Sequence, residues 1–189
     1  MRCPTLACSG LLGLMFLLLT PVAFAQPTDD APPQRPQANP ADVSSVDAII
    51  NAAYEVLSGP IGQPRDWDRD RSLFHPTARL AHTQWQPGGQ RASIYPMTHE
   101  EHISAVSGYT VERGFTEREI GRKVVSYGTV THVFSTYEYT TEDGSMSGRG
   151  INSFQLFYDG TRYWITSIIW SQESPEHPIP DTFIDEDTR

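Results

Sequence analysis

The sequence predicts an α+β fold, a cone in which three N-terminal helices pack on a curved, mostly antiparallel sheet. Helical patterns occupy the first part of the chain, at 40–58, 66–74 and 98–108. From Phe115 to Trp170 the chain instead reads as four strands joined by short turns that contain glycine. Because a curled sheet closed by helices encloses space, we expect a pocket for a small molecule.

Residues 1–25 have the pattern of a secretory signal peptide. Arg2 provides a basic start, Leu11–Leu19 is apolar, and the small-x-small sequence AFA at 23–25 is a cleavage signal. Both cysteines of the chain lie within this segment, so the mature protein contains no disulfide. We expect a periplasmic or secreted protein that has no membrane anchor after cleavage and whose stability comes from packing.

Three further segments follow the signal peptide. Residues 26–40 are rich in proline and polar residues and are predicted to form a flexible leader. Residues 41–180 are long enough for one domain with a sizeable core, and 181–189 form an acidic C-terminal tail. The net charge of −9 argues against nucleic acid as a partner, because the phosphate backbone requires basic groups.

The helices are predicted from caps and apolar stripes. Asn39-Pro40 is a helix start, and Gly59-Pro60 ends the helix. Its apolar residues recur three or four apart, at Val43, Val46, Ile50, Ala53 and Leu57. The second helix, 66–74, ends at His75-Pro76, and the third begins with a capping box of Thr98 and Glu101 and ends near Gly108.

The strands are aligned by their turns. Strands at 80–85 and 91–95 flank the turn at 87–89. For the later strands we assume two-residue loops at 127–128, 143–144 and 159–160. This register places Arg118 opposite Tyr137, and Asn152 opposite both Ser135 and Ser167. Since alternate residues of a strand point to opposite faces, these five side chains share one face.

Several segments resemble the nuclear transport factor 2-like (NTF2-like, SnoaL-like) superfamily, in particular an exported bacterial branch of it. They are FHPTARL at 74–80, FTEREI at 115–120, HVFSTYE at 132–138, RGINS at 149–153 and DGTRYWI at 159–165. The resemblance covers about Val43 to Pro180. It implies that Tyr163 and Ile165 point into the cone, which would make the face with Arg118 the concave one.

The resemblance also bears on partners and activity. Superfamily members commonly form dimers through the outer sheet face, which here would carry Phe134, Trp164, Ile168 and Trp170. The resemblance therefore implies a homodimer. Ketosteroid isomerases, dehydratases, epoxide hydrolases and polyketide cyclases share this fold, which does not itself decide the activity.

The candidate ligand-binding residues are Arg118, Ser135, Tyr137, Asn152 and Ser167. Arg118 on a half-apolar concave face needs an anion if it is buried. The anion is either a ligand carboxylate or phosphate, or a carboxylate of the chain such as Glu55, Asp70 or Glu112; alternatively, the guanidinium reaches solvent. The neutral polar groups would orient a small ligand, or else bond to one another or to water.

An enzyme would also require a general base. Tyr137 could act as the acid, but the strand residues assigned to this face provide no base, so we consider His75 or His82 with Asp70 as orienting partner. Glu117, Glu119 and Glu138 are interpreted as members of cross-strand ion pairs with Arg118 and Arg149.

We expect no metal and no cofactor. His99 and His102 are three residues apart, whereas a helical zinc motif places its histidines four apart. The sequence thus favours a small-molecule-binding protein whose ligand is partly apolar. An isomerase, dehydratase or hydrolase, and a protein-interaction module that uses the outer sheet face, are the alternatives.

Overall fold

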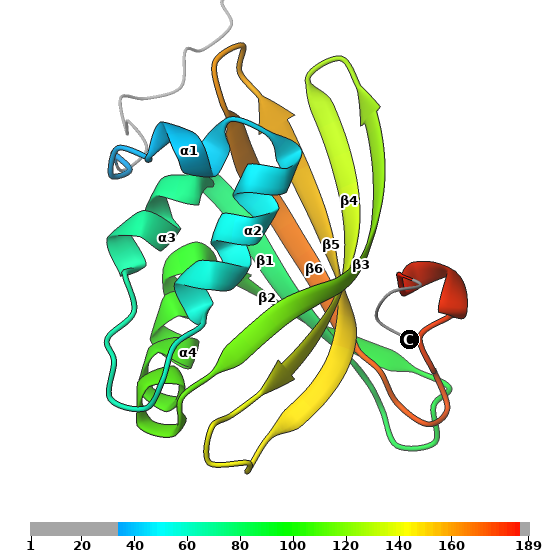
Figure 1. Cartoon of the computed structure of the whole chain (residues 1–189). Helices are drawn as coiled ribbons and strands as arrows, with labels where there is room; N and C mark the ends of the chain where they lie inside the picture. The colour runs from blue at the N-terminus through cyan, green and yellow to red at the C-terminus, as the bar shows by residue number, and fades with distance from the viewer. Residues whose placement is uncertain (1–33, 186–189) are drawn as a thin grey trace, which may run out of the picture. The chain divides into compact units, whose positions relative to one another are not determined.

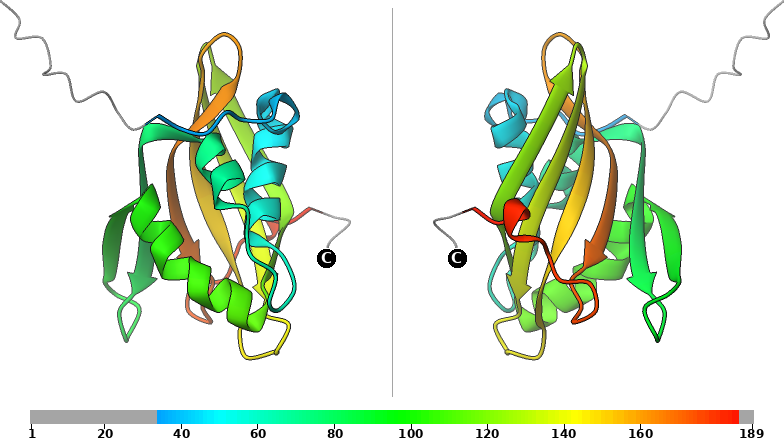
Figure 2. Two further views of the ribbon diagram at one scale, coloured as in Figure 1. Left: turned by 90° about the vertical axis from the view of Figure 1, so that its left-hand side faces the viewer. Right: turned by 90° about the vertical axis from the view of Figure 1, so that its right-hand side faces the viewer.

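Four helices lie on one face of a six-stranded mixed sheet in the computed structural model, which describes residues 34–185 (Figures 1 and 2). The predicted α+β class is therefore confirmed. The signal peptide predicted at 1–25, and the leader up to residue 33, lie outside the described residues. No helix in the described part is both long enough and apolar enough to span a membrane.

The first predicted helix is two helices, α1 (Pro40–Val43) and α2 (Val46–Leu57). The Ser45 hydroxyl accepts a hydrogen bond from the Ala48 amide at 3.1 Å and so caps α2. Serine favours such caps over helix interiors, which explains the interruption of the apolar stripe. The next helix, α3 (Trp67–Leu73), is capped by Asp66.

The last helix, α4 (His99–Arg113), lies between β2 and β3 in the chain. Its predicted capping box of Thr98 and Glu101 is present. The predicted end near Gly108 is wrong: the helix continues to Arg113, and Gly114 ends it with a φ of 63°. One exposed glycine does not stop a helix that packs on a sheet, and the added turn brings Tyr109 and Thr110 over the sheet.

The sheet has the strand order β2-β1-β6-β5-β4-β3. Only β1 and β6 pair in parallel; the other neighbours are antiparallel. The strands are β1 (Phe74–Trp85), β2 (Ala92–Thr98), β3 (Thr116–Tyr127), β4 (Val130–Thr140), β5 (Ser147–Tyr158) and β6 (Tyr163–Gln172).

The predicted register is correct between β4 and β5, where Ser135 lies opposite Asn152. The other two pairings differ from the prediction. The turns lie at 128–129 and 159–162, which shifts each pairing by two residues and leaves the faces unchanged. Two β-bulges do change the faces. Ile120 is an extra residue in β3, and Arg118 consequently lies opposite Glu138. Thr166 is an extra residue in β6, and Asn152 lies opposite Trp170. Since one extra residue reverses the alternation of side chains, each bulge exchanges the two faces over half of its strand.

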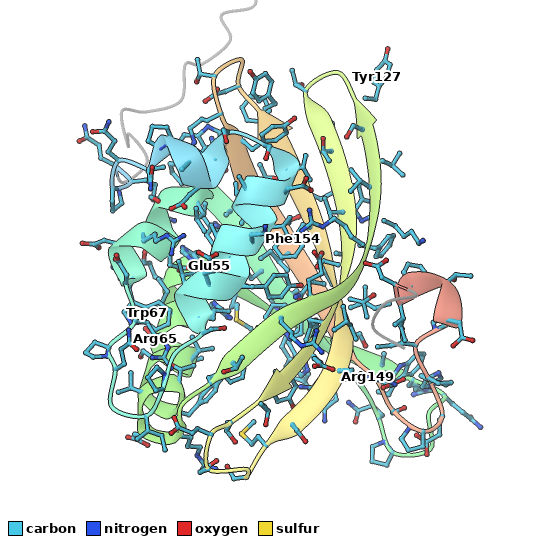
Figure 3. All side chains as sticks on the ribbon, in the orientation of Figure 1. Glu55, Arg65, Trp67, Tyr127, Arg149 and Phe154 are labelled. Atoms are coloured by element: carbon cyan, nitrogen blue, oxygen red, sulfur yellow. The ribbon has the colours of Figure 1, made fainter. Side chains whose placement is uncertain are left out.

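The core lies between the helices and the concave face of the sheet. Its strand residues include Val133, Phe154, Leu156 and Ile165, each at most 2% exposed. Figure 3 shows Phe154 pointing from β5 toward α2, while Arg149 lies on the opposite side of the sheet.

Arg65 ties the loop between α2 and α3 to α4. Its guanidinium is 7% exposed and donates hydrogen bonds of 2.6–2.8 Å to four backbone carbonyls. The acceptors are Leu57, Gly59, Gln63 and Thr110. A buried cation needs such acceptors, and this set fixes α4 over the sheet.

Both ends of the described chain pack against the domain. Arg35, within the predicted leader, contacts Glu100 of α4 at 3.0 Å. At the other end, η1 (Asp181–Phe183) lies on the outer sheet face (Figure 2), where the Thr136 hydroxyl donates to the Phe183 carbonyl at 2.6 Å. Gly121 permits this approach, since a Cβ there would lie 2.1 Å from the same carbonyl oxygen.

Candidate functional site

A cavity of about 330 Å³ lies between the helices and the concave face of the sheet. Its walls come from three helices, α2, α3 and α4, and from all six strands of the sheet. Aromatic side chains dominate the lining: Tyr54, Phe74, Tyr109, Phe115, Tyr137, Tyr139, Phe154 and Trp170. Such a wall suits an apolar ligand body.

Glu117 of β3 is the carboxylate at the centre of this aromatic wall. The side chain is half-buried and lines the cavity, and no salt bridge to it occurs among the described residues. Burial raises the pKa of the Glu117 carboxyl to about 7, and a hydrogen bond from Asn152 opposes this increase only in part. At neutral pH the group therefore exchanges readily between its acid and base forms.

Asn152 and Tyr54 begin a chain of hydrogen bonds that runs away from the cavity. The Asn152 amide donates to the Tyr54 hydroxyl at 3.2 Å, and the Tyr54 and Ser135 hydroxyls are 2.6 Å apart. Ser135 in turn donates to Glu119 at 2.5 Å. Because a serine hydroxyl has one hydrogen, Tyr54 must donate to Ser135. Its proton therefore points away from the cavity, and burial raises the pKa of the Tyr54 hydroxyl.

Glu119, two residues after Glu117 on the same face, has a different environment. Arg122 binds it through Nε at 2.9 Å and Nη2 at 2.5 Å, and also contacts Asp47 of α2. The Arg122 guanidinium thus neutralises Glu119 and leaves Glu117 without a cation.

Tyr137 of β4 lies beside Glu117 in the cavity wall. It is 3% exposed, and its hydroxyl forms no hydrogen bond with any described residue. Burial, with the nearby Glu117 charge, raises the pKa of this hydroxyl, so it remains a hydrogen-bond donor throughout the physiological range. Gly150 makes room for it, because a Cβ there would lie 2.4 Å from the Tyr137 hydroxyl.

A second group of titratable residues lies at the α3–α4 side of the cavity. Asp70 and His102 line it, and Asp70 Oδ2 is 2.7 Å from His99 Nε2, an ion-pair contact without hydrogen-bond geometry. His99 stacks on Phe74 with ring centroids 3.8 Å apart. Burial lowers the pKa of His102 to about 4, so His102 is neutral at pH 7.

The structure brings some of the predicted site residues together and separates the others. Tyr137 and Asn152 line the cavity. Ser135 lies behind the wall, fully buried in the hydrogen-bond chain from Tyr54. The predicted concave placement of Arg118 and Ser167 is wrong: neither lines the cavity, and each lies on the reversed half of a bulged strand.

Arg118 has a structural partner on the outer face. Its guanidinium pairs with Glu138 at 2.6 Å, and its side chain is 57% exposed. The two residues line a separate pocket of about 410 Å³ together with Arg149. The proposed pairing with Glu55, Asp70 or Glu112 does not occur. Of the predicted cross-strand ion pairs, Arg118 with Glu138 is found, whereas Arg149 pairs with Glu173 and Glu119 pairs with Arg122.

The bulge in β6 also corrects the predicted outer face. Ile168 and Trp170 line the cavity, and Ile169 is on the outside with 44% exposure. Trp164 lies before the bulge and stays on the outer face, where the Arg162 guanidinium covers its ring at 3.6 Å.

The histidines considered as bases differ in position. His75 bonds to the Thr77 hydroxyl at 2.8 Å and does not line the cavity. His82 does line it, with its ring 5.8 Å from that of Trp170. The predicted ion pair of Glu117 is wrong, because no arginine or lysine among the described residues pairs with it, and its place in the cavity wall was missed. The available indication was Gly121, since an isolated glycine inside a strand suggests a bulge.

No protein-family model matches the sequence, and no curated protein matches it. Solved structures do match. A Streptomyces avermitilis protein of the NTF2-like family, named as a proposed dehydratase, has a TM-score of 0.52 at 14% identity, over 70% of this chain and 96% of that one. The fold is NTF2-like.

Two further solved structures have TM-scores close to this value. The beta subunit of benzoate 1,2-dioxygenase from Burkholderia mallei has a TM-score of 0.50 at 15% identity, over 75% of this chain and 96% of that one. An NTF2-like superfamily protein from Salmonella enterica has a TM-score of 0.48 at 16% identity, over 66% of this chain and 86% of that one. The match to the Streptomyces structure confirms the NTF2-like resemblance predicted from the sequence for the fold.

The raised pKa of Glu117 predicts a pH-dependent effect of Glu117→Gln. The folded state disfavours the ionised carboxyl, so the native protein loses stability as the pH rises from about 4.5 to above 7. Gln cannot ionise. The variant should have a melting temperature several degrees above that of the native protein at pH 8 and no advantage at pH 4.

Thermal unfolding at pH 4, 6 and 8 measures this difference, and Glu112→Gln, at an exposed position on α4, is the matched control. A constant difference across the three pH values would contradict the assignment of a displaced pKa to Glu117.

Proposed function

We propose that the protein binds a small, partly apolar molecule in the cavity between the helices and the sheet. The observation that carries this proposal is the aromatic lining of a space of about 330 Å³ that also contains the polar groups of Glu117, Tyr137 and Asn152. Cavities of this size with a few convergent polar groups are typical ligand sites. The signal-peptide pattern at 1–25 supports placing this activity in the periplasm or outside the cell.

Filling the cavity should abolish binding. Val106 lines it from α4, so Val106→Trp should weaken the binding of 2-naphthol, a neutral aromatic probe, by about tenfold or more. Fluorescence titration measures the affinity. Val125→Trp adds the same ring at a position that is 74% exposed and serves as the control. Equal affinities for both variants, or no binding by the native protein, would refute the cavity as a ligand site.

Proton-transfer catalysis of the isomerase or dehydratase type is the second candidate. It is favoured by a specific pair: Glu117, whose pKa is about 7, and Tyr137, a hydroxyl donor with no described partner, face the same cavity. Glu117 could remove a proton next to a carbonyl group while Tyr137 donates a hydrogen bond to the oxygen that gains charge. The Streptomyces relative named as a proposed dehydratase is consistent with such chemistry.

Deuterium exchange tests this second candidate. The protein should catalyse exchange of the protons next to the carbonyl of small aryl ketones in D₂O, with a rate that rises with pH and is half-maximal near pH 7, because the base form of Glu117 is required. Glu117→Gln should reduce the rate by about 100-fold or more. Exchange measured by NMR that persists in the variant would exclude Glu117 as the base.

We further propose a homodimer formed through the outer sheet face. Exposed apolar side chains gather there on β3 to β6: Val125, Val130, Phe134, Phe157 and Ile169. Phe183 covers Phe134 with ring centroids 5.7 Å apart, while Val130 remains 56% exposed. Contiguous exposed apolar patches are typical of interfaces.

A charge in this patch should separate the subunits. Val130→Glu should give the monomer mass in light scattering, because the carboxylate would be desolvated in the interface. Ile94→Glu, on β2 with 58% exposure, is the control and should leave the dimer unchanged. A native monomer, or a dimer that withstands Val130→Glu, would contradict this interface.

A further inference from the structure

The cavity is lined by aromatic rings and by two carboxylates, Glu117 and Asp70, of which Asp70 contacts His99; it has no basic side chain other than histidine among the described residues. Among the described residues, no arginine or lysine lines it. The three arginines nearest to Glu117 in sequence are engaged elsewhere. Arg118 pairs with Glu138 on the outer face, Arg122 pairs with Glu119 and Asp47, and Arg113 donates a hydrogen bond to the Ser145 hydroxyl at 2.8 Å. The positive charge that Glu117 lacks must therefore come from outside the chain, or the carboxyl must take up a proton.

The rings around Glu117 form a continuous row. The ring centroids of Tyr109 and Phe115 are 5.9 Å apart, those of Phe115 and Tyr139 are 5.7 Å apart, and those of Tyr139 and Tyr137 are 6.3 Å apart. The Glu117 charge acts on Tyr109 and on Tyr137, where it contributes to raised pKa values, so it lies close to both ends of the row.

We propose that the ligand of this cavity is an organic cation, an amine or quaternary ammonium with an apolar body, whose charged group lies between Glu117 and this row of rings. The faces of aromatic rings carry negative electrostatic potential and attract cations, and quaternary ammonium groups are bound in such aromatic cages. The carboxylate adds a direct charge partner. The inference rests on the proposed ligand-binding function and names its ligand class.

The alternatives fit the same surroundings less well. An anionic ligand would face Glu117 without a basic partner in the lining and would lose its hydration. A neutral ligand would leave the ionised carboxylate as unpaired as it is in the free protein. A cation stabilises the ionised form of Glu117, and the net charge of −9 favours its approach from solution.

Binding of a permanent cation should follow the ionisation of Glu117. Of the other titratable groups around the cavity, Tyr54 of α2, Tyr109 of α4 and Tyr137 of β4 have raised pKa values, and His102 of α4 has a lowered one. These four groups therefore keep their charge state between pH 5.5 and 8.5.

The remaining titratable groups in the lining are Tyr139 of β4, Asp70 of α3 and His82 of β1. The Tyr139 hydroxyl accepts a hydrogen bond from Gln172 at 3.1 Å, and Asp70 contacts His99. The His82 ring lies 5.8 Å from that of Trp170, and the variant His82→Gln is included as a control for this second ionisable side chain in the lining.

Three probes of matched size test the ligand class. Benzyltrimethylammonium is a permanent cation, neopentylbenzene is its neutral isostere, and phenylacetate is an anion. Each competes with 2-naphthol for the mature protein between pH 5.5 and 8.5. At pH 8 the cation should bind at least about tenfold more tightly than the isostere, and this ratio should decrease below pH 7. Glu117→Gln should lower the ratio at pH 8 by about tenfold and remove its pH dependence, whereas His82→Gln should preserve both.

The outcomes separate the two proposals. If 2-naphthol binds but the cation competes no better than the neutral isostere, or if phenylacetate competes best, the cation inference is overturned and the ligand-binding function stands. A preference for the cation whose size and pH dependence are unchanged by Glu117→Gln also overturns the inference. If neither 2-naphthol nor any of the three probes binds, the cavity is not a ligand site and both proposals fail.

Discussion

The extra residues at Ile120 in β3 and Thr166 in β6 determine which side chains meet inside the cone. Each reverses the alternation of its strand, since a strand repeats every two residues and one inserted residue exchanges its faces. Without the first bulge, Arg118 would point into the cavity in place of Glu117. Without the second, Trp170 would face outward. The chemical character of the site therefore depends on two local irregularities of the backbone and not on the overall fold.

The two glutamates that the first bulge turns inward show how neighbouring groups acquire different properties. Glu119 accepts hydrogen bonds from the Arg122 guanidinium and from the Ser135 hydroxyl. It is the last acceptor in a chain of hydrogen bonds in which every donor has an acceptor. Glu117 accepts a hydrogen bond from the Asn152 amide but has no cation beside it, and burial raises its pKa to about 7. An unpaired carboxylate in a partly buried site lowers the stability of the native state, and such a cost is characteristic of groups that serve a ligand or a reaction.

The fold could be predicted from the sequence because its elements have local sequence patterns. Examples are the capping box of Thr98 and Glu101, the apolar stripe of α2, and the β4–β5 register that pairs Ser135 with Asn152. The sequence was insufficient for the site. A bulge changes the face of a side chain without changing the apolar or polar character of the strand, so only Gly121 indicated the first one. The second follows a loop, at 159–162, that is longer than the two residues assumed. Tyr137 and Asn152 were placed correctly because β4 and β5 contain no bulge.

The length of α4 links the fold to the proposed chemistry. The helix continues past Gly108, and its last turns bring Tyr109 to one end of the row of rings that surrounds Glu117. Arg65 then fixes this part of the helix, since one of its four acceptors is the carbonyl of Thr110. A helix that ended at Gly108 would leave Phe115 and Glu117 without this cover and in contact with water, where a carboxylate needs no partner and a ring attracts a cation weakly. The burial of Glu117 therefore depends on the turn of α4 that follows Gly108. This burial is the reason why the carboxylate is stabilised by a proton or by a cation.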